Sequence, residues 1–306
     1  MLKVTIGTRG SPLALAQARE FQAALIAANS SLDADSIEIA VIRTGADKQP
    51  ERPISELGGK GLFVKEIEDA LLAGRIDVAV HSVKDLPGIL PEGVELACVL
   101  PREDPRDAFI SRVAGSLDKL PQGAAVGTSS PRRQSQILAH RPDLEIRPLR
   151  GNVATRLRKL EEGVAAATIL AMAGLNRLGL AEEITAVIEP DVMLPAVGQG
   201  AIGGECRSGD TRILELLAAV NHQESAVRIR AERAFLAALG GSCRTPIGGF
   251  AEIAEKRLVF RGLVASLDGT SSFQTVRRGE LKDAAAMGKD AGIELRARAG
   301  PGMFAA

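Results

Sequence analysis

The stretch KVTIGTRGSPLAL, residues 3–15, has the pattern of a strand that ends in a tight turn and leads directly into a helix. Ser11 and Pro12 stand where that helix would begin. Serine is a preferred N-cap, and proline at the first helical position loses no hydrogen bond. A second stretch, AAVGTSSPRRQ (124–134), repeats the same order of strand, turn and Ser-Pro helix start. The repetition predicts two lobes of similar construction.

Strands and helices alternate along the first two thirds of the chain. Strands are predicted at 3–8, 37–44, 75–82, 124–128, 144–149 and 165–171, and helices at 12–28, 61–74, 130–141 and 153–163. This alternation is typical of α/β domains with largely parallel sheets. Ligands of such folds bind beyond the carboxyl ends of the strands. We therefore expect a ligand where those ends of the two lobes face each other.

The final third of the chain has a different pattern. Two helices are predicted at 211–219 and 222–239, followed by the glycine-rich stretch GGSCRTP (240–246). Three antiparallel strands, with an Asp-Gly turn at 268–269, and a closing helix are then predicted at 247–253, 257–265, 271–280 and 282–297. This part indicates a separate α+β module with a small antiparallel sheet.

Composition narrows the class of protein. The 306 residues suffice for about two or three domains, and 38 basic residues balance 38 acidic ones. Neutral charge and the absence of Tyr and Trp give no support to a nucleic-acid partner. The N-terminus lacks the pattern of a signal peptide, and the longest apolar run, at 164–175, is too short to span a bilayer. We expect a cytoplasmic protein that binds neither membranes nor nucleic acids.

The three cysteines stand in different settings. Cys98 lies in the apolar run VELACVL and is predicted to be a core residue, whereas the setting of Cys206 does not decide its role. Cys243 stands in the glycine-rich stretch GGSCRTP. The odd number of cysteines, without a CxxC pair, is typical of a reducing compartment. The three histidines share no ligand spacing with one another or with a cysteine, so no metal site is predicted.

Positive charge is concentrated in one part of the chain. Between Thr128 and Leu160 there are seven Arg and one Lys against one Asp and one Glu. Arginine suits bidentate binding of carboxylates or phosphates, and the helix start after Ser130 adds backbone amides. The phosphate-binding glycine signatures are absent, since ELGGKGLF (56–63) lacks the required spacing and VGQGAIGGE (197–205) lacks a strand-turn-helix context. A solvated basic face remains the alternative to a binding site for an anion, with carboxylates as its natural ligand groups.

The stretch HSVKDLP (81–87) is a second candidate site. Lys84 and Asp85 follow the buried strand predicted at 75–82, at the position where that strand leaves its sheet. A carboxylate there can transfer protons or stabilise a cationic intermediate. The same residues also form an ordinary turn, so the pattern alone leaves both interpretations open.

Taken together, these motifs resemble the porphobilinogen deaminase (hydroxymethylbilane synthase) family along nearly the whole chain. The resemblance rests on an ordered set of stretches: TRGSPLAL, GGKGLFVKEIE, VHSVKDLP, REDPRDAF, GTSSPRRQ, LRGNVATRL, LAMAGLNRLGL, LPAVGQGAIGGECR and SCRTPI. It implies three domains, of which the first two resemble the lobes of periplasmic binding proteins with the active site between them. Their expected bounds are 1–100 with 198–220 for lobe 1, 101–197 for lobe 2, and 221–306 for a C-terminal domain that anchors a cofactor.

The resemblance also implies the chemistry. In the family, a loop cysteine carries a dipyrromethane cofactor through a thioether bond, and Cys243 matches that cysteine. Four porphobilinogen molecules are joined head to tail with loss of ammonia, and water releases hydroxymethylbilane for haem biosynthesis. Asp85 matches the catalytic aspartate, which stabilises positive charge on pyrrole nitrogens and assists proton transfer. A monomer without a metal is expected.

Residue-by-residue matching implies further contacts with the carboxylates of cofactor and substrate. The implied cofactor-binding residues, besides Cys243, are Ser82, Lys84, Thr128, Ser129, Ser130, Arg132, Arg133, Arg156 and Gly200. The implied substrate-binding residues are Arg9, Ser11, Lys60, Arg150, Arg177 and Gln199. Three positions depart from the family pattern: Pro131 replaces a leucine, Ser242 a glycine and Glu56 a lysine found in some relatives. The departure at Glu56 puts one peripheral carboxylate contact in doubt.

Two other classes of function compete with the deaminase. A binding module with two lobes would close on an anion without chemistry, but it gives no reason for the Cys243 loop. A cysteine acyltransferase or hydrolase would need a histidine near Cys243 and would turn over esters or amides. Colour bound to the denatured protein in the Ehrlich reaction for pyrroles would support the deaminase and neither rival.

Overall fold

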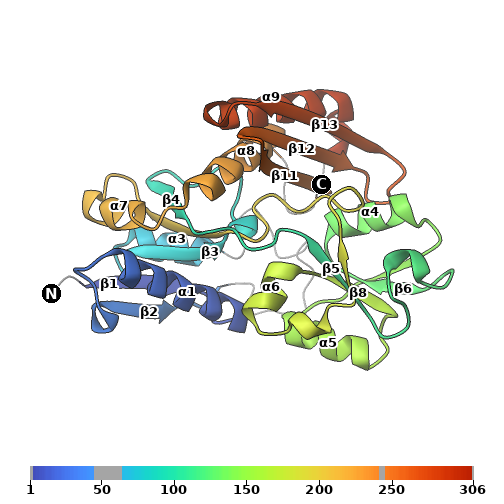
Figure 1. Ribbon diagram of the computed structural model, residues 1–306, viewed down its shortest axis with the longest axis horizontal. Helices are drawn as coiled ribbons and strands as arrows, with labels where there is room; N and C mark the ends of the chain where they lie inside the picture. Colours follow the sequence, from blue (N-terminus) through green and yellow to red (C-terminus); the bar gives the residue numbers. More distant parts are fainter. Residues whose placement is uncertain (1–2, 45–63, 241–244, 305–306) are drawn as a thin grey trace. The chain divides into compact units, whose positions relative to one another are not determined.

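The computed structural model describes residues 3–44, 64–240 and 245–304 (Figure 1). The chain divides into two compact units. Unit 1 comprises Met1–Glu103 and Ala201–Ala226, and unit 2 comprises Asp104–Gly200 and Val227–Ala306. Cys243, Lys60, Ser242 and Glu56 lie outside the described residues, so the predictions that concern them stay predictions.

The sheet of unit 1 is mostly parallel. Its strand order is β2-β1-β3-β10-β4. The strands are β1 (Val4–Thr8), β2 (Ile37–Val41), β3 (Val78–Ser82), β4 (Val94–Val99) and β10 (Ile202–Arg207). Strand β1 pairs in parallel with β2 and β3, whereas β10 runs antiparallel between β3 and β4. Among the residues of this unit that the structure describes are the helices α1 (Pro12–Ala28), α3 (Lys65–Leu72) and α7 (Thr211–Ala218).

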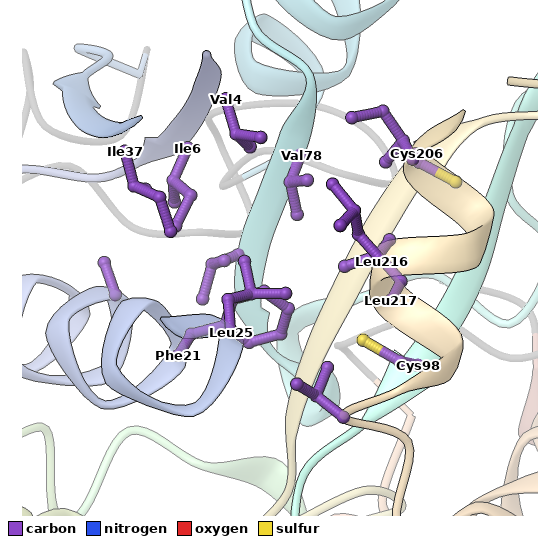
Figure 2. Close-up of a cluster of buried hydrophobic side chains, with 14 of the residues drawn as sticks. Val4, Ile6, Phe21, Leu25, Ile37, Val78, Cys98, Cys206, Leu216 and Leu217 are labelled. Atoms are coloured by element: carbon purple, nitrogen blue, oxygen red, sulfur yellow. The ribbon is translucent and has the colours of Figure 1, made fainter. Parts of the chain in front are cut away.

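The main core of unit 1 lies between this sheet and helices α1 and α7 (Figure 2). Phe21 and Leu25 of α1 point into it and are fully buried. Strand β10 passes so close to α1 that a Cβ on Gly204 would lie 2.5 Å from the ring of Phe21. Glycine therefore fits at Gly204, and a Cβ on the neighbouring Gly203 would lie 2.6 Å from the side chain of Leu96, which accounts for the Gly-Gly pair in this strand.

Unit 2 contains two sheets. The first has the order β7-β6-β8-β5-β9. Its strands are β5 (Asp107–Ser111), β6 (Ala125–Gly127), β7 (Glu145–Arg147), β8 (Ala167–Ala171) and β9 (Ala186–Ile188). Strands β6, β7 and β8 are parallel, and β5 runs antiparallel to both β8 and β9. Its helices are α4 (Pro131–His140), α5 (Val153–Glu161) and α6 (Met172–Arg177).

The second sheet of unit 2 is an antiparallel meander. It consists of β11 (Ile247–Ala254), β12 (Arg257–Ala265) and β13 (Ser272–Gly279). Helices α8 (Gln223–Leu239) and α9 (Ala284–Ala299) contribute to its core, where the rings of Phe235 and Phe260 lie 5.0 Å apart. The predicted α/β lobes and the small antiparallel sheet are thus confirmed. The division at 1–100, 101–197, 198–220 and 221–306 stays a prediction.

Candidate active site

A small pocket in unit 1 lies at the start of α1 and the end of β3. Ser11 caps α1, and its hydroxyl accepts a hydrogen bond from the amide of Ala14 at 3.3 Å, as the Ser-Pro pattern predicted. The pocket has a volume of about 70 Å³. Its polar lining consists of Thr8, Arg9, Ser11, Gln17, His81, Ser82 and Asp85. The structure therefore brings together four of the residues that the sequence marked in this lobe: Arg9, Ser11, Ser82 and Asp85.

Ser82 is held by a side chain that the sequence did not mark. The Nε2 atom of Gln17 lies 2.8 Å from the Ser82 hydroxyl, and the hydroxyl lies 3.0 Å from Oε1 of the same amide. Gln17 is buried on α1, so the first helix fixes the hydroxyl at the end of β3. A single glutamine among the alanines and leucines of the helix predicted at 12–28 was the available sequence signal.

Asp85 closes a 3-10 turn, Val83–Asp85, that directly follows β3. Its carboxylate is half-buried and lines the pocket, and Lys84 is the preceding residue of the same turn. Val83 is buried, which anchors the turn to the body of the unit. The position combines a fixed backbone with a carboxylate that reaches the pocket, as proton transfer requires.

The second candidate region is the start of helix α4 in unit 2. Ser130 caps this helix, and its hydroxyl accepts from the amide of Arg133 at 3.4 Å. The Ser130 amide in turn donates to the hydroxyl of Thr128 at 3.2 Å. The hydroxyl of Ser129 is buried and has no hydrogen-bonding partner within the described part of the chain. A ligand with acceptor oxygens at this helix start would supply that partner.

Arg132 and Arg133, which belong to the basic stretch between Thr128 and Leu160, are paired with an acidic side chain from outside that stretch. Both are buried and contact the carboxylate of Asp107, Arg132 through Nη1 at 2.7 Å and Arg133 through Nη2 at 2.7 Å. Their remaining hydrogen bonds reach the carbonyls of Leu194 and Ile169. Asp107 lies at the start of β5, outside the stretch in which the charges were counted. The charge count over 128–160 therefore left out the acidic partner of these two residues.

Asp107 is the centre of this buried network. Besides the two arginines, Nε2 of Gln199 donates to its Oδ1 at 3.0 Å. Burial alone would raise the pKa of Asp107, but the charges of Arg132 and Arg133 outweigh burial and hold the pKa well below its usual range. Asp107 lies within the stretch REDPRDAF, and no role was predicted for it from the sequence. An acid at the first position of a strongly apolar strand was the signal that could have identified it.

Arg156 is the arginine that best fits an anionic ligand. Its Nε donates to the carbonyl of Gly151 at 2.9 Å, and no carboxylate pairs with it among the residues that the structure describes. Burial and, to a smaller extent, the charges of Arg133 and Arg150 lower the pKa of Arg156 to about 10. Arg147, in contrast, pairs with Glu145 on the surface. An anion near Arg156 would relieve this accumulation of positive charge.

The segment that leaves unit 2 is held by two side chains. The Nη1 atom of Arg177 donates to the carbonyl of Gly200 at 3.1 Å, so these two predicted residues lie together. The amide of Gly198 donates at 2.7 Å to Glu232, a buried carboxylate of α8. Gly198 and Gly200 have φ values of +73° and +89°, which favour glycine at both positions.

Two of the three cysteines are unsuited to nucleophilic chemistry. Cys98 is buried in the core, as predicted, and Cys206 lies buried in the same core. Burial raises the pKa of each thiol to about 12, Cys98 and Cys206 alike. Since the thiolate is the reactive form, neither is suited to carry a covalent group.

The described residues include neither a membrane-spanning helix nor a metal-binding cluster. No helix there is long and apolar enough to cross a membrane. The same residues contain no group of three or more His, Cys, Asp or Glu side chains that could hold a metal ion.

Two models of one protein family match this chain. The family model "Porphobilinogen deaminase, dipyromethane cofactor binding domain" matches residues 4–215, and "Porphobilinogen deaminase, C-terminal domain" matches residues 226–297. The periplasmic VFT2 domain of BvgS from Bordetella pertussis is among the similar solved structures, with a TM-score of 0.40, 16% identity and coverage of 72% of this chain and 86% of that one.

Curated relatives extend over nearly the whole chain. The porphobilinogen deaminase of Paracoccus denitrificans is 55% identical over 301 residues, which cover 98% of this chain and 96% of the relative. The porphobilinogen deaminase of Nitrobacter winogradskyi is 56% identical, and the match covers 98% of this chain and 95% of the relative. The chloroplastic enzyme of Oryza sativa is 53% identical, with 98% and 85% covered. The chain therefore belongs to the porphobilinogen deaminase family.

Proposed function

We propose that Asp85 in unit 1 and the arginines of unit 2 carry out the condensation of four porphobilinogen molecules into hydroxymethylbilane, on a dipyrromethane cofactor attached to Cys243. Family membership gives the activity and the cofactor: the chain is a transferase of tetrapyrrole biosynthesis and has the cofactor-binding domain. The observation that carries the proposal is this match to the family along both units. The residue roles are inferences from the site geometry.

The residues of unit 2 fit the cofactor. A dipyrromethane built from two substrate units has acetate and propionate side chains, and when bound it supplies the pyrrole carbon to which the first substrate is joined. Arg156, next to Arg133 and Arg150, and the buried hydroxyl of Ser129 offer donors to such carboxylates. The hydrogen bonds of Thr128 and Ser130, the two chain neighbours of Ser129, hold the start of α4 in place. We assign cofactor binding to Arg156 and Ser129 in the first place.

Arg132 and Arg133 have a supporting part in this proposal. Asp107 neutralises one of their two charges, so the group of three keeps a net positive charge in the interior. This net charge favours an anionic ligand, while the hydrogen bonds to Asp107 fix the guanidinium groups in position. Gln199 and Gly200, held by Asp107 and Arg177, border the same network.

The residues of unit 1 fit the reacting end of the substrate. Asp85 would stabilise the positive charge that develops on a pyrrole nitrogen and take up or return its proton. Ser82, fixed by Gln17, and Ser11 offer hydroxyl groups in the same pocket. Arg9 and Lys60 are proposed to bind the carboxylates of porphobilinogen, and Lys84 those of the cofactor.

Cys243 is proposed as the attachment point because the other two thiols are buried and hard to ionise. Sulfur is a strong nucleophile towards an electrophilic methylene-pyrrole. A cytoplasmic location, a monomeric state and a mechanism without a metal complete the proposal. Two free buried cysteines are consistent with a reducing compartment.

The stoichiometry of the reaction tests the proposal. Incubation with porphobilinogen is expected to release four ammonia molecules for each linear tetrapyrrole, measured by a coupled ammonia assay and by the absorbance of the cyclised product. A binding module would release no ammonia. A cysteine hydrolase would turn over a model ester without forming a tetrapyrrole. Either of these results would contradict the proposal.

A further inference from the structure

Three ionisable side chains meet in the interior of unit 1, on the face of the sheet that α3 covers. His81 of β3 and Glu205 of β10 lie on the same face because β3 and β10 pair with Gly203 opposite His81. The Nε2 atom of His81 is 3.3 Å from Oε2 of Glu205, and their side chains are 3% and 0% exposed. Glu68 of α3 is buried beside them and interacts electrostatically with both. We call Glu68, His81 and Glu205 the buried triad.

The polar atoms of the triad are incompletely satisfied. Oε1 of Glu68, Nε2 of His81 and both carboxylate oxygens of Glu205 are buried and have no hydrogen-bonding partner in the residues described by the structure. Two ionised carboxylates beside one imidazole would leave net negative charge in a dry interior, which is costly. A proton on one carboxylate removes that charge and provides a new donor.

The surroundings of Glu68 favour its protonated form. Burial and, to a smaller extent, the charge of Glu205 raise the pKa of Glu68 to about 7. The charge of His81 lowers this pKa, whereas the charge of the exposed Asp69 on the same helix raises it slightly. Arg9 and Asp85 are the other charged groups that line the pocket with His81.

The triad is connected to the candidate site along the chain. His81 lines the pocket itself, and Ser82 and Asp85 follow it within four residues. We propose that Glu68 is a positioning residue that holds a proton in the buried triad and, in that protonated form, keeps α3 packed against the end of β3 that presents Ser82 and Asp85. The effect of Glu68 on catalysis rests on the proposed function, whereas the presence of a proton on Glu68 does not.

The pH dependence has a definite sign. In the unfolded chain the Glu68 side chain has its ordinary pKa of 4.5 and loses its proton near that pH. In the folded protein the pKa is about 7, so the proton is kept up to about pH 7. Between these values the folded state binds more protons than the unfolded state, so stability falls as pH rises. Above pH 7 both states are ionised at Glu68, and its contribution no longer changes.

Glu68→Gln is the variant that tests this inference, because Gln has the shape of the protonated acid and cannot ionise. The difference in Tm between Glu68→Gln and wild type is expected to change by several degrees in favour of Glu68→Gln as the pH rises from 5 to 8. The matched control, Asp69→Asn, removes a charge from the exposed side of the same helix and should show a much smaller change. An equal Tm difference at both pH values would overturn the inference.

Two further measurements separate the proton from its role in positioning. Infrared spectra of wild type at pH 6 should contain a protonated carboxyl band that disappears near pH 7 and is absent from Glu68→Gln. Turnover number should decrease above pH 7 in wild type, and this decrease should move to higher pH in Glu68→Gln. An unchanged alkaline limb, with the band present, would refute the positioning role. Loss of the proposed function would instead appear as no tetrapyrrole at any pH, with the infrared and Tm results intact.

Discussion

Replacing Asp85 by Asn is expected to lower the turnover number for tetrapyrrole formation by about 10²–10⁴-fold, the range that a positioned acid-base group contributes. Asparagine retains the shape of the side chain but can neither carry a negative charge nor accept a proton at neutral pH. Asp85 lies in a 3-10 turn anchored by the buried Val83, so the turn should survive the change. We expect a wild-type circular dichroism spectrum and a Tm close to that of wild type.

Glu92→Gln is the matched control for this prediction. Glu92 is an exposed carboxylate in the same unit, seven residues further along the chain. Its replacement removes the same charge and should leave turnover at the wild-type level. Near-normal tetrapyrrole production by Asp85→Asn would exclude Asp85 from the mechanism. A large fall in Tm would show that its role is structural.

Replacing Asp107 by Asn is expected to give the largest loss of stability, about 3–5 kcal/mol, because it leaves two buried guanidinium groups without their carboxylate. Asp107 is fully buried and contacts Arg132, Arg133 and Gln199. The free energy of unfolding, measured in urea at pH 7, checks the prediction. Cofactor loading should also fall, since the same change releases Arg132 and Arg133.

The pH dependence of wild type provides a second check of the Asp107 network. The pKa of Asp107 lies below its ordinary value of about 3.9. The ionised Asp107, paired with Arg132 and Arg133, therefore stabilises the fold at pH values above about 3.9. The contribution is lost only as pH falls through the lower, folded-state pKa. Glu145→Gln, which breaks the exposed pair with Arg147 in the same sheet, is the control and should have little effect. Equal stability of Asp107→Asn and Glu145→Gln would contradict the account.

Local patterns predicted many elements of the fold, but not strands β4, β5, β9 and β10 or helix α6. The helix starts at Pro12 and Pro131 agree with the structure because a serine cap and a following proline act within one turn of helix. The three strands of the antiparallel sheet also lie within a residue or two of their predicted bounds. Each of these signals depends on residues that are close in sequence.

Interactions between distant residues could not be predicted in this way. Strand β10 inserts between β3 and β4 although more than one hundred residues separate it from them, and its Gly-Gly pair weakens the strand pattern. Asp107 reaches Arg132 and Arg133 from another strand, and the buried triad draws its members from one helix and two strands. Family resemblance marked the arginines and Asp85, but it did not mark Asp107, Gln17 or Glu68.

The intact mass of the purified protein tests the central claim, covalent attachment of the cofactor at Cys243. Wild type and the control Cys98→Ala, whose thiol is buried, are expected to carry an excess mass of two deaminated porphobilinogen units. Cys243→Ser should have the mass of the unmodified chain. If wild type remains unmodified after incubation with porphobilinogen, or if Cys243→Ser carries the same adduct, the account is contradicted.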